Sequence, residues 1–180
     1  LVTSRCQFTL PGLSALSLAC LTTRDSVEFL RQRAPRVGEL AEEAARICGQ
    51  LPLALEVLAG LVNEKRLIPV AELLDRLRRP QGELNEVIDA AFALSFGFLN
   101  TQLRERWLLL SVFPASFDFV AVAAVWQVTE DDAREAMQTL VNTSLVAWNE
   151  STLRFASHDL ARDFAARHLP PDASQTARLR

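Results

Sequence analysis

The sequence predicts a mainly α protein, in which a small helical bundle is followed by a winged-helix domain with a C-terminal β-hairpin. Apolar residues recur at helical spacing through most of the chain, and prolines and capping residues stand where helices would begin. Residues 143–148 and 153–156 carry β-branched and aromatic side chains on either side of a polar turn, which indicates a hairpin. Three helices followed by a hairpin is the element order of a winged-helix domain.

The composition is that of an ordinary globular chain, with 180 residues, 49% hydrophobic residues and a net charge of −3. No apolar run is long enough to span a bilayer, and no basic stretch precedes an apolar signal region, so we expect a cytoplasmic protein without a membrane partner. Cys6, Cys20 and Cys48 are far apart and only two histidines accompany them. We therefore predict free thiols and no metal site.

The first third of the chain begins as the tail of an α/β unit. Leu1-Val2-Thr3 is strand-like, and because the chain opens there we expect a piece of a longer protein. A short helix is predicted over residues 25–33, and an amphipathic helix over 36–48, which Gly49 would stop.

The next helix begins at Pro52, a favoured first position, and its apolar residues on every side predict that it is buried. Pro69 opens a further helix to about residue 79. Pro80-Gln81-Gly82 is the best internal boundary.

Helices are then predicted over residues 86–96 and 101–113, the second ended by Pro114. Asp118 would cap an apolar helix that ends at Trp126. Thr129, with an aspartate three residues later, resembles a capping box at the start of the last helix before the hairpin.

The hairpin leads into a helix that opens with a His-Asp pair. We predict that Ser157 caps this helix and that Asp159 lies in its first turn, where the helix dipole favours an anion. Leu160, Phe164 and His168 would share one face of the helix. His158 then stands at a strand-to-helix corner with outward backbone N–H groups, which suits an anion such as a phosphate.

A winged helix raises the alternative of a DNA-binding or protein-interaction module. The segment in the position of a recognition helix, residues 130–138, carries four acids and a single arginine, and the hairpin offers only Arg154. Affinity for DNA comes mainly from Lys and Arg at the phosphates, so this composition argues against nucleic acid.

An enzyme within this chain is a third alternative. The sequence has no Gly-rich Lys-Ser/Thr phosphate loop and no hydrophobic run ending in paired acids. We therefore predict no catalytic residues in this chain.

Three motifs together resemble the signal-transducing ATPases with numerous domains (the NB-ARC or apoptotic ATPase family). They are Leu1-Val2-Thr3-Ser4-Arg5, Gln50-Leu51-Pro52-Leu53-Ala54-Leu55 and Ser157-His158-Asp159-Leu160. This family includes apoptotic protease-activating factors, plant disease-resistance proteins and many bacterial regulators. The resemblance covers almost the whole chain. It implies four segments: a C-terminal remnant of the P-loop nucleotide-binding domain (1–35), a small helical domain (36–82), a winged-helix domain (83–169) and a linker (170–180).

The resemblance also implies which residues meet the nucleotide. Arg5 would sense the terminal phosphate, and His158 would reach the β-phosphate of ADP. Pro52 would pack beside the adenine, with Leu51 and Leu53 as apolar walls. Gly49, Ser157 and Asp159 would support this site. The chain departs from the family pattern at Gln50, where glycine is usual, and at Ser157, where methionine is usual.

The implied function is the regulatory part of a nucleotide-operated signalling switch. ADP would hold the winged helix and the helical domain against an upstream nucleotide-binding domain, which would also bind magnesium. Exchange for ATP would release the winged helix and permit homo-oligomerisation. The resemblance further implies a downstream repeat domain and a parent protein that is an ATPase.

Overall fold

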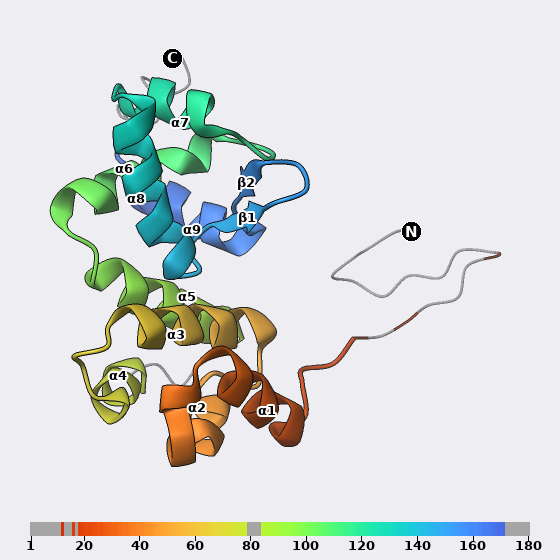
Figure 1. The fold of residues 1–180 in the computed structure, drawn as a ribbon. Coiled ribbons are helices and arrows are strands. Elements are labelled where there is room, and N and C mark those ends of the chain that lie inside the picture. The colour runs from red at the N-terminus through yellow and green to blue at the C-terminus, as the bar shows by residue number, and fades with distance from the viewer. Residues whose placement is uncertain (1–11, 13–15, 17, 79–83, 172–180) are drawn as a thin grey trace.

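The computed structural model describes residues 12, 16, 18–78 and 84–171. In that part of the chain the protein is mainly helical, with one two-stranded antiparallel hairpin near the C-terminus, and the predicted fold class is confirmed. Figure 1 shows two layers joined through the middle: α1, α2 and α4 at one end, α3 and α5 side by side at the centre, and α6 to α9 with the hairpin at the other end.

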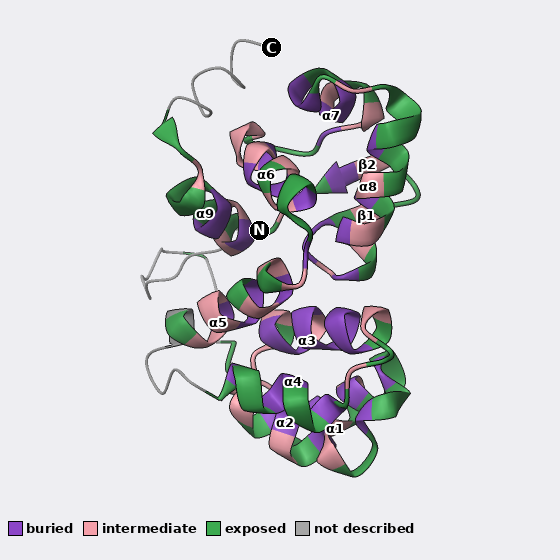
Figure 2. Ribbon diagram, turned by 90° about the vertical axis from the view of Figure 1, so that its left-hand side faces the viewer, coloured by how far each residue is buried: buried purple, intermediate pink, exposed green. Residues whose placement is uncertain are grey.

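The first layer is a helical bundle. Its elements are α1 (Thr23–Arg33), the 3-10 helix η1 (Pro35–Leu40), α2 (Ala41–Ile47), α3 (Pro52–Glu64) and α4 (Val70–Leu77). α1 packs on α2 and α3, and α4 packs on η1 and α5. Helix α3 is buried along most of its length, as its apolar sequence predicts (Figure 2).

One predicted helix of the bundle is divided. A continuous helix over residues 36–48 was expected, and the structure instead has η1 and then α2, because Gly38 takes a non-helical backbone at φ 54° and ψ −124°. A positive φ is open to glycine at no steric cost, so Gly38 is the residue that permits the break.

Helix α5 (Leu84–Gly97) joins the two layers, because it packs against α3 and α4 on one side and α9 on the other. Its Phe92 and Phe96 lie in one aromatic cluster with Trp107 of α6 and Phe164 of α9, with ring centroids 5.7 to 6.4 Å apart. This cluster fixes the second layer to the centre of the molecule.

The second layer has the predicted element order. It contains α6 (Thr101–Leu109), the 3-10 helix η2 (Leu110–Val112), α7 (Phe119–Trp126), α8 (Glu130–Asn142), β1 (Ala147–Asn149), β2 (Arg154–Ala156) and α9 (Asp159–His168). Two predicted caps are confirmed: Asp118 Oδ1 accepts from the Ala121 N–H at 2.9 Å, and Thr129 Oγ1 from the Asp132 N–H at 3.2 Å.

A third extended segment pairs with the hairpin. The N–H of Phe117, just before α7, donates to the Phe155 carbonyl at 2.9 Å, and the Phe155 N–H donates back at 2.7 Å. Phe117 therefore lies beside β2 on the edge opposite β1. This pairing was not predicted, since one bridging residue leaves no alternating pattern in the sequence.

The prediction that Ser157 caps α9 is wrong. The first helical hydrogen bond runs from the Arg162 N–H to the His158 carbonyl, at 2.9 Å, which makes His158 the N-cap. Ser157 stands one residue too early, because an N-cap side chain accepts from the second or third residue that follows it.

Several predictions lie outside the described residues: the strand at Leu1-Val2-Thr3, Arg5, the boundary at Pro80-Gln81-Gly82, and nearly all of the 170–180 linker. The four-segment domain division stays a prediction. None of the helices in the described part of the chain combines the length and low charge that crossing a membrane requires.

Candidate functional site

The turn between α2 and α3 contains two consecutive residues with a left-handed backbone, Gly49 at φ 59° and Gln50 at φ 58°. The Gly49 N–H donates to the Arg46 carbonyl and the Gln50 N–H to the Ala45 carbonyl, at 3.1 and 3.0 Å, which is the Schellman pattern of a helix end. Gly49 therefore ends α2 as predicted. Gln50 stands where the resembling family has glycine, and it takes a conformation that glycine would adopt freely.

Pro52 is the first residue of α3 and is exposed, with Leu51 and Leu53 half-buried on either side of it in sequence. Leu51 is the N-cap residue and its side chain makes no capping hydrogen bond. The first N–H groups of α3 therefore lack a side-chain acceptor, and the start of this helix offers an apolar surface beside free backbone donors.

The two ring nitrogens of His158 are in different environments. Nδ1 accepts from the Leu160 N–H at 3.2 Å, which requires that this nitrogen be unprotonated. We infer that the neutral ring carries its proton on Nε2. The side chain is exposed, and Nε2 makes no hydrogen bond to the described residues. His158 thus presents one N–H donor to an external acceptor while it caps α9.

Ser157 and Asp159 are the residues on either side of His158. Asp159 is the first residue of α9, with 68% of its side chain exposed, and its carboxylate pairs with Arg162 at 3.0 Å. The Ser157 hydroxyl makes no hydrogen bond within the described part of the chain. The ion pair with Arg162 partly neutralises the charge of Asp159, so this carboxylate repels an anion bound near His158 less strongly.

The two described ends of the predicted site belong to different layers. Pro52 opens α3 and His158 caps α9, and α5 packs against both helices. None of the hydrogen bonds, ion pairs or ring contacts of the described residues joins Leu51 or Pro52 to His158. A ligand common to both would therefore need to bridge the two layers.

The basic residue of the hairpin is engaged within the protein. Arg154 Nε donates to Ser116 Oγ at 2.9 Å, its Nη2 donates to the Ser116 carbonyl at 2.6 Å, and its Nη1 pairs with Asp118 at 3.2 Å. The guanidinium thus ties β2 to the segment before α7, which leaves the hairpin without a free cation for a phosphate backbone.

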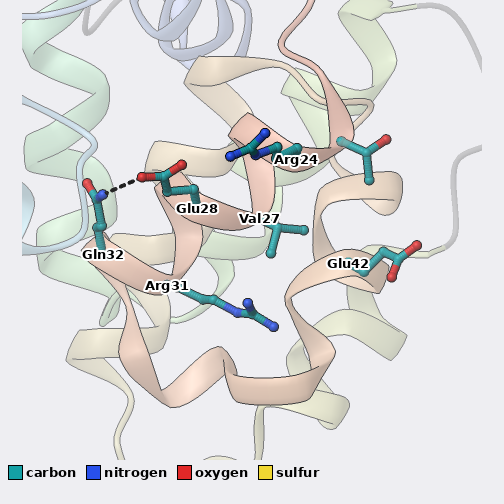
Figure 3. Close-up of a pocket in the computed structure, with 7 residues that line it drawn as sticks. Arg24, Val27, Glu28, Arg31, Gln32 and Glu42 are labelled. Carbon is teal, nitrogen blue, oxygen red and sulfur yellow. Dashed lines mark hydrogen bonds between the residues drawn. The ribbon is translucent and has the colours of Figure 1, made fainter.

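A shallow hollow lies on the outer side of the bundle, between α1 and the start of α2 (Figure 3). Arg24, Glu28 and Arg31 extend from α1, and Glu42 comes from α2; Glu28 accepts a hydrogen bond from Gln32 at 3.2 Å. The hollow contains none of the predicted site residues. Its mixed charges and open form indicate solvated surface.

No protein-family model matches the chain. The regulatory protein AfsR of Streptomyces griseus is 28% identical over 178 residues, which cover 92% of this chain and 18% of AfsR. The putative disease resistance RPP13-like protein 3 of Arabidopsis thaliana is 30% identical over 157 residues, covering 78% of this chain and 18% of that protein. The disease resistance protein RPP13 of the same plant is 28% identical over 177 residues, covering 84% of this chain and 21% of RPP13.

The chain thus spans about a fifth of the length of the curated relatives it matches. The similarity extends over most of this chain and reaches both a bacterial regulator and plant resistance proteins. The chain is therefore similar to one segment of much longer regulatory and resistance proteins.

Proposed function

We propose that this chain is the helical and winged-helix part of a signal-transducing ATPase with numerous domains, and that it helps to hold ADP in a closed, inactive state. The similarity to AfsR and to RPP13-like proteins supports this class of protein. The order of a helical bundle, four further α-helices (α5 to α8) and a hairpin agrees with it. The upstream nucleotide-binding domain, which would bind magnesium, belongs to this proposal, as do a downstream repeat domain, homo-oligomerisation on activation and a cytoplasmic location.

The observation that carries the nucleotide role is the free Nε2 of His158. Because Nδ1 is engaged by the Leu160 N–H, the ring is held in the tautomer that donates from Nε2, and a phosphate oxygen is an acceptor for that donor. The exposed Pro52 and the half-buried Leu51 supply apolar surface suited to a planar base. The described residues suit ADP as a ligand, and Arg5 belongs to the proposal as the residue that senses the terminal phosphate of the nucleotide.

ADP acts in this proposal as a ligand of the closed arrangement. It contacts the bundle through Pro52 and the second layer through His158, so it binds more tightly when the two layers and the upstream domain are together. A ligand shifts a conformational equilibrium only by its difference in affinity between the two states. Loss of the His158 contact should therefore favour the open, active state.

The test is made on the full-length protein that contains this chain. We expect the purified protein to release stoichiometric ADP on denaturation, and His158→Ala to retain much less of it. His158→Ser is the matched control, because serine restores an N-cap worth about 1 kcal/mol but does not replace the imidazole donor. Depletion of ADP in both variants, with stability restored in His158→Ser alone, supports the phosphate contact. Undiminished ADP in His158→Ala contradicts it.

A further inference from the structure

Gln50 connects three parts of the bundle. Its carbonyl accepts from the Leu21 N–H at 3.1 Å, and its side-chain Nε2 donates to Thr23 Oγ1 at 3.1 Å. Its own N–H closes the end of α2 on the Ala45 carbonyl. Two residues further on, Pro52 begins α3. Gln50 therefore links the start of α1 to the turn before α3 by two hydrogen bonds, in addition to the packing of α1 on α3.

The backbone of Gln50 makes this arrangement costly for any residue except glycine. A left-handed conformation costs a residue with a Cβ about 1–2 kcal/mol, and asparagine and aspartate tolerate it better than glutamine does. A glycine would satisfy the turn and keep both backbone hydrogen bonds. What glutamine adds is the side-chain amide that reaches Thr23.

We propose that Gln50 is a positioning residue, which holds the start of α3 and Pro52 in register with the segment entering α1. This inference rests on the proposed function, in which Pro52 contacts the base of ADP and the entering segment comes from the nucleotide-binding domain. Movement of that segment is passed to α3 through the Leu21 and Thr23 contacts. Gln50 thereby couples the proposed base contact to the upstream domain.

The variant Gln50→Gly separates positioning from folding. We expect it to unfold at the same temperature as the wild type or higher, because the backbone strain is relieved. In the full-length protein, release of a fluorescent ADP analogue should become roughly three- to tenfold faster, the range that one lost hydrogen bond gives. If Gln50 contributes only to stability, a variant as stable as the wild type should release the ADP analogue no faster than the wild type does.

Thr23→Val is the matched variant on the other side of the contact, since it removes Oγ1 and keeps the shape of the side chain. It should accelerate release as Gln50→Gly does, and the double variant should add nothing further, because both changes remove one hydrogen bond. Additive effects of the two changes overturn the proposal.

Amide hydrogen exchange gives a readout that needs no nucleotide. We expect faster exchange at Leu55 and Glu56, the first amides of α3 whose N–H groups have helical acceptors, in Gln50→Gly and in Thr23→Val at unchanged melting temperature. Unchanged exchange at these amides overturns the positioning role. If the wild-type protein binds no ADP, the proposed function is overturned. The exchange measurement then tests separately whether Gln50 positions the start of α3.

Discussion

Gly60 of α3 lies directly against the turn that ends α8: a Cβ atom on Gly60 would come within 2.6 Å of Ser144 Oγ and 2.8 Å of the Thr143 carbonyl carbon. Nearby, the Asn142 side-chain amide donates to Glu64 at 3.4 Å. The absence of a side chain at Gly60 thus permits the close approach of the bundle to the second layer.

We expect Gly60→Ala to destabilise the protein by about 1–3 kcal/mol, the usual cost of overpacking, although alanine is the better helix former. The side chain meets backbone atoms, which yield less than a flexible side chain would. The measurement is the free energy of unfolding in urea. Gly97→Ala is the control, because nothing lies within 4 Å of a Cβ there, and it should be neutral or stabilising. Equal effects of the two changes would contradict the close contact.

Most helices could be predicted from the sequence, because their caps and prolines are local signals. Asp118 and Thr129 act as the caps that their positions indicate. The helix ends at Gln127 and Ser144 carried no such signal, since both take positive φ values of 55° and 56° without being glycine. Their conformation is set by hydrogen bonds to the preceding turn, which a pattern of residue types does not show.

The candidate site was less accessible to sequence reasoning. A His-Asp pair after a hairpin identified the corner, but the serine before it looked like the better cap. The helix starts one residue later than that interpretation requires, so the imidazole of His158 accepts the capping bond. The link from Gln50 to Thr23 spans 27 residues, and nothing local in the sequence indicates it.

Because Arg154 forms hydrogen bonds with Ser116 and an ion pair with Asp118, its substitution should destabilise the hairpin. Arg154→Ala removes the bonds to Ser116 and Asp118, and it should lower the free energy of unfolding by about 1 kcal/mol, because the group is partly exposed. Arg154→Lys should recover little of this loss, since an ammonium cannot reproduce the forked geometry. Full recovery in the lysine variant would show that charge alone matters.

The same engagement bears on the DNA alternative. With Arg154 bound internally and the first turn of α8 acidic, we expect no shift of a labelled duplex at low salt. Binding that weakens steeply with added salt, and is lost in Arg154→Ala, would instead favour a DNA-binding module.

Arg36 closes the end of α3. Its Nη1 donates to the Val62 carbonyl at 2.6 Å and its Nη2 to the Ile68 carbonyl at 3.1 Å. Arg36→Ala should cost about 1.5–3 kcal/mol, the range for hydrogen bonds to a charged group, measured by urea unfolding. Arg66→Ala is the matched control, because Arg66 makes one bond of 3.3 Å in the same region. A smaller loss in Arg36→Ala than in the control would rule out this capping role.

The buried thiol of Cys48 should make the protein less stable at alkaline pH. Burial raises the pKa of its thiol from 9.0 to about 12, because the thiolate is poorly solvated inside the bundle. Below pH 9 the thiol is protonated in both the folded and the unfolded protein, so it contributes no pH dependence. Between pH 9 and 12 only the unfolded protein releases the proton, and the free energy of unfolding should fall by about 1.4 kcal/mol per pH unit.

The composition makes this fall measurable, since the chain has no tyrosine and Lys65 is its single lysine. Cys48→Ala should lower stability at neutral pH through the cavity it leaves, and should flatten the alkaline slope. Thiol labelling at pH 8 provides a second check: the exposed Cys20 should react quickly, and Cys48 only as the protein unfolds. An alkaline slope that is the same in Cys48→Ala and in the wild type would assign it to other groups.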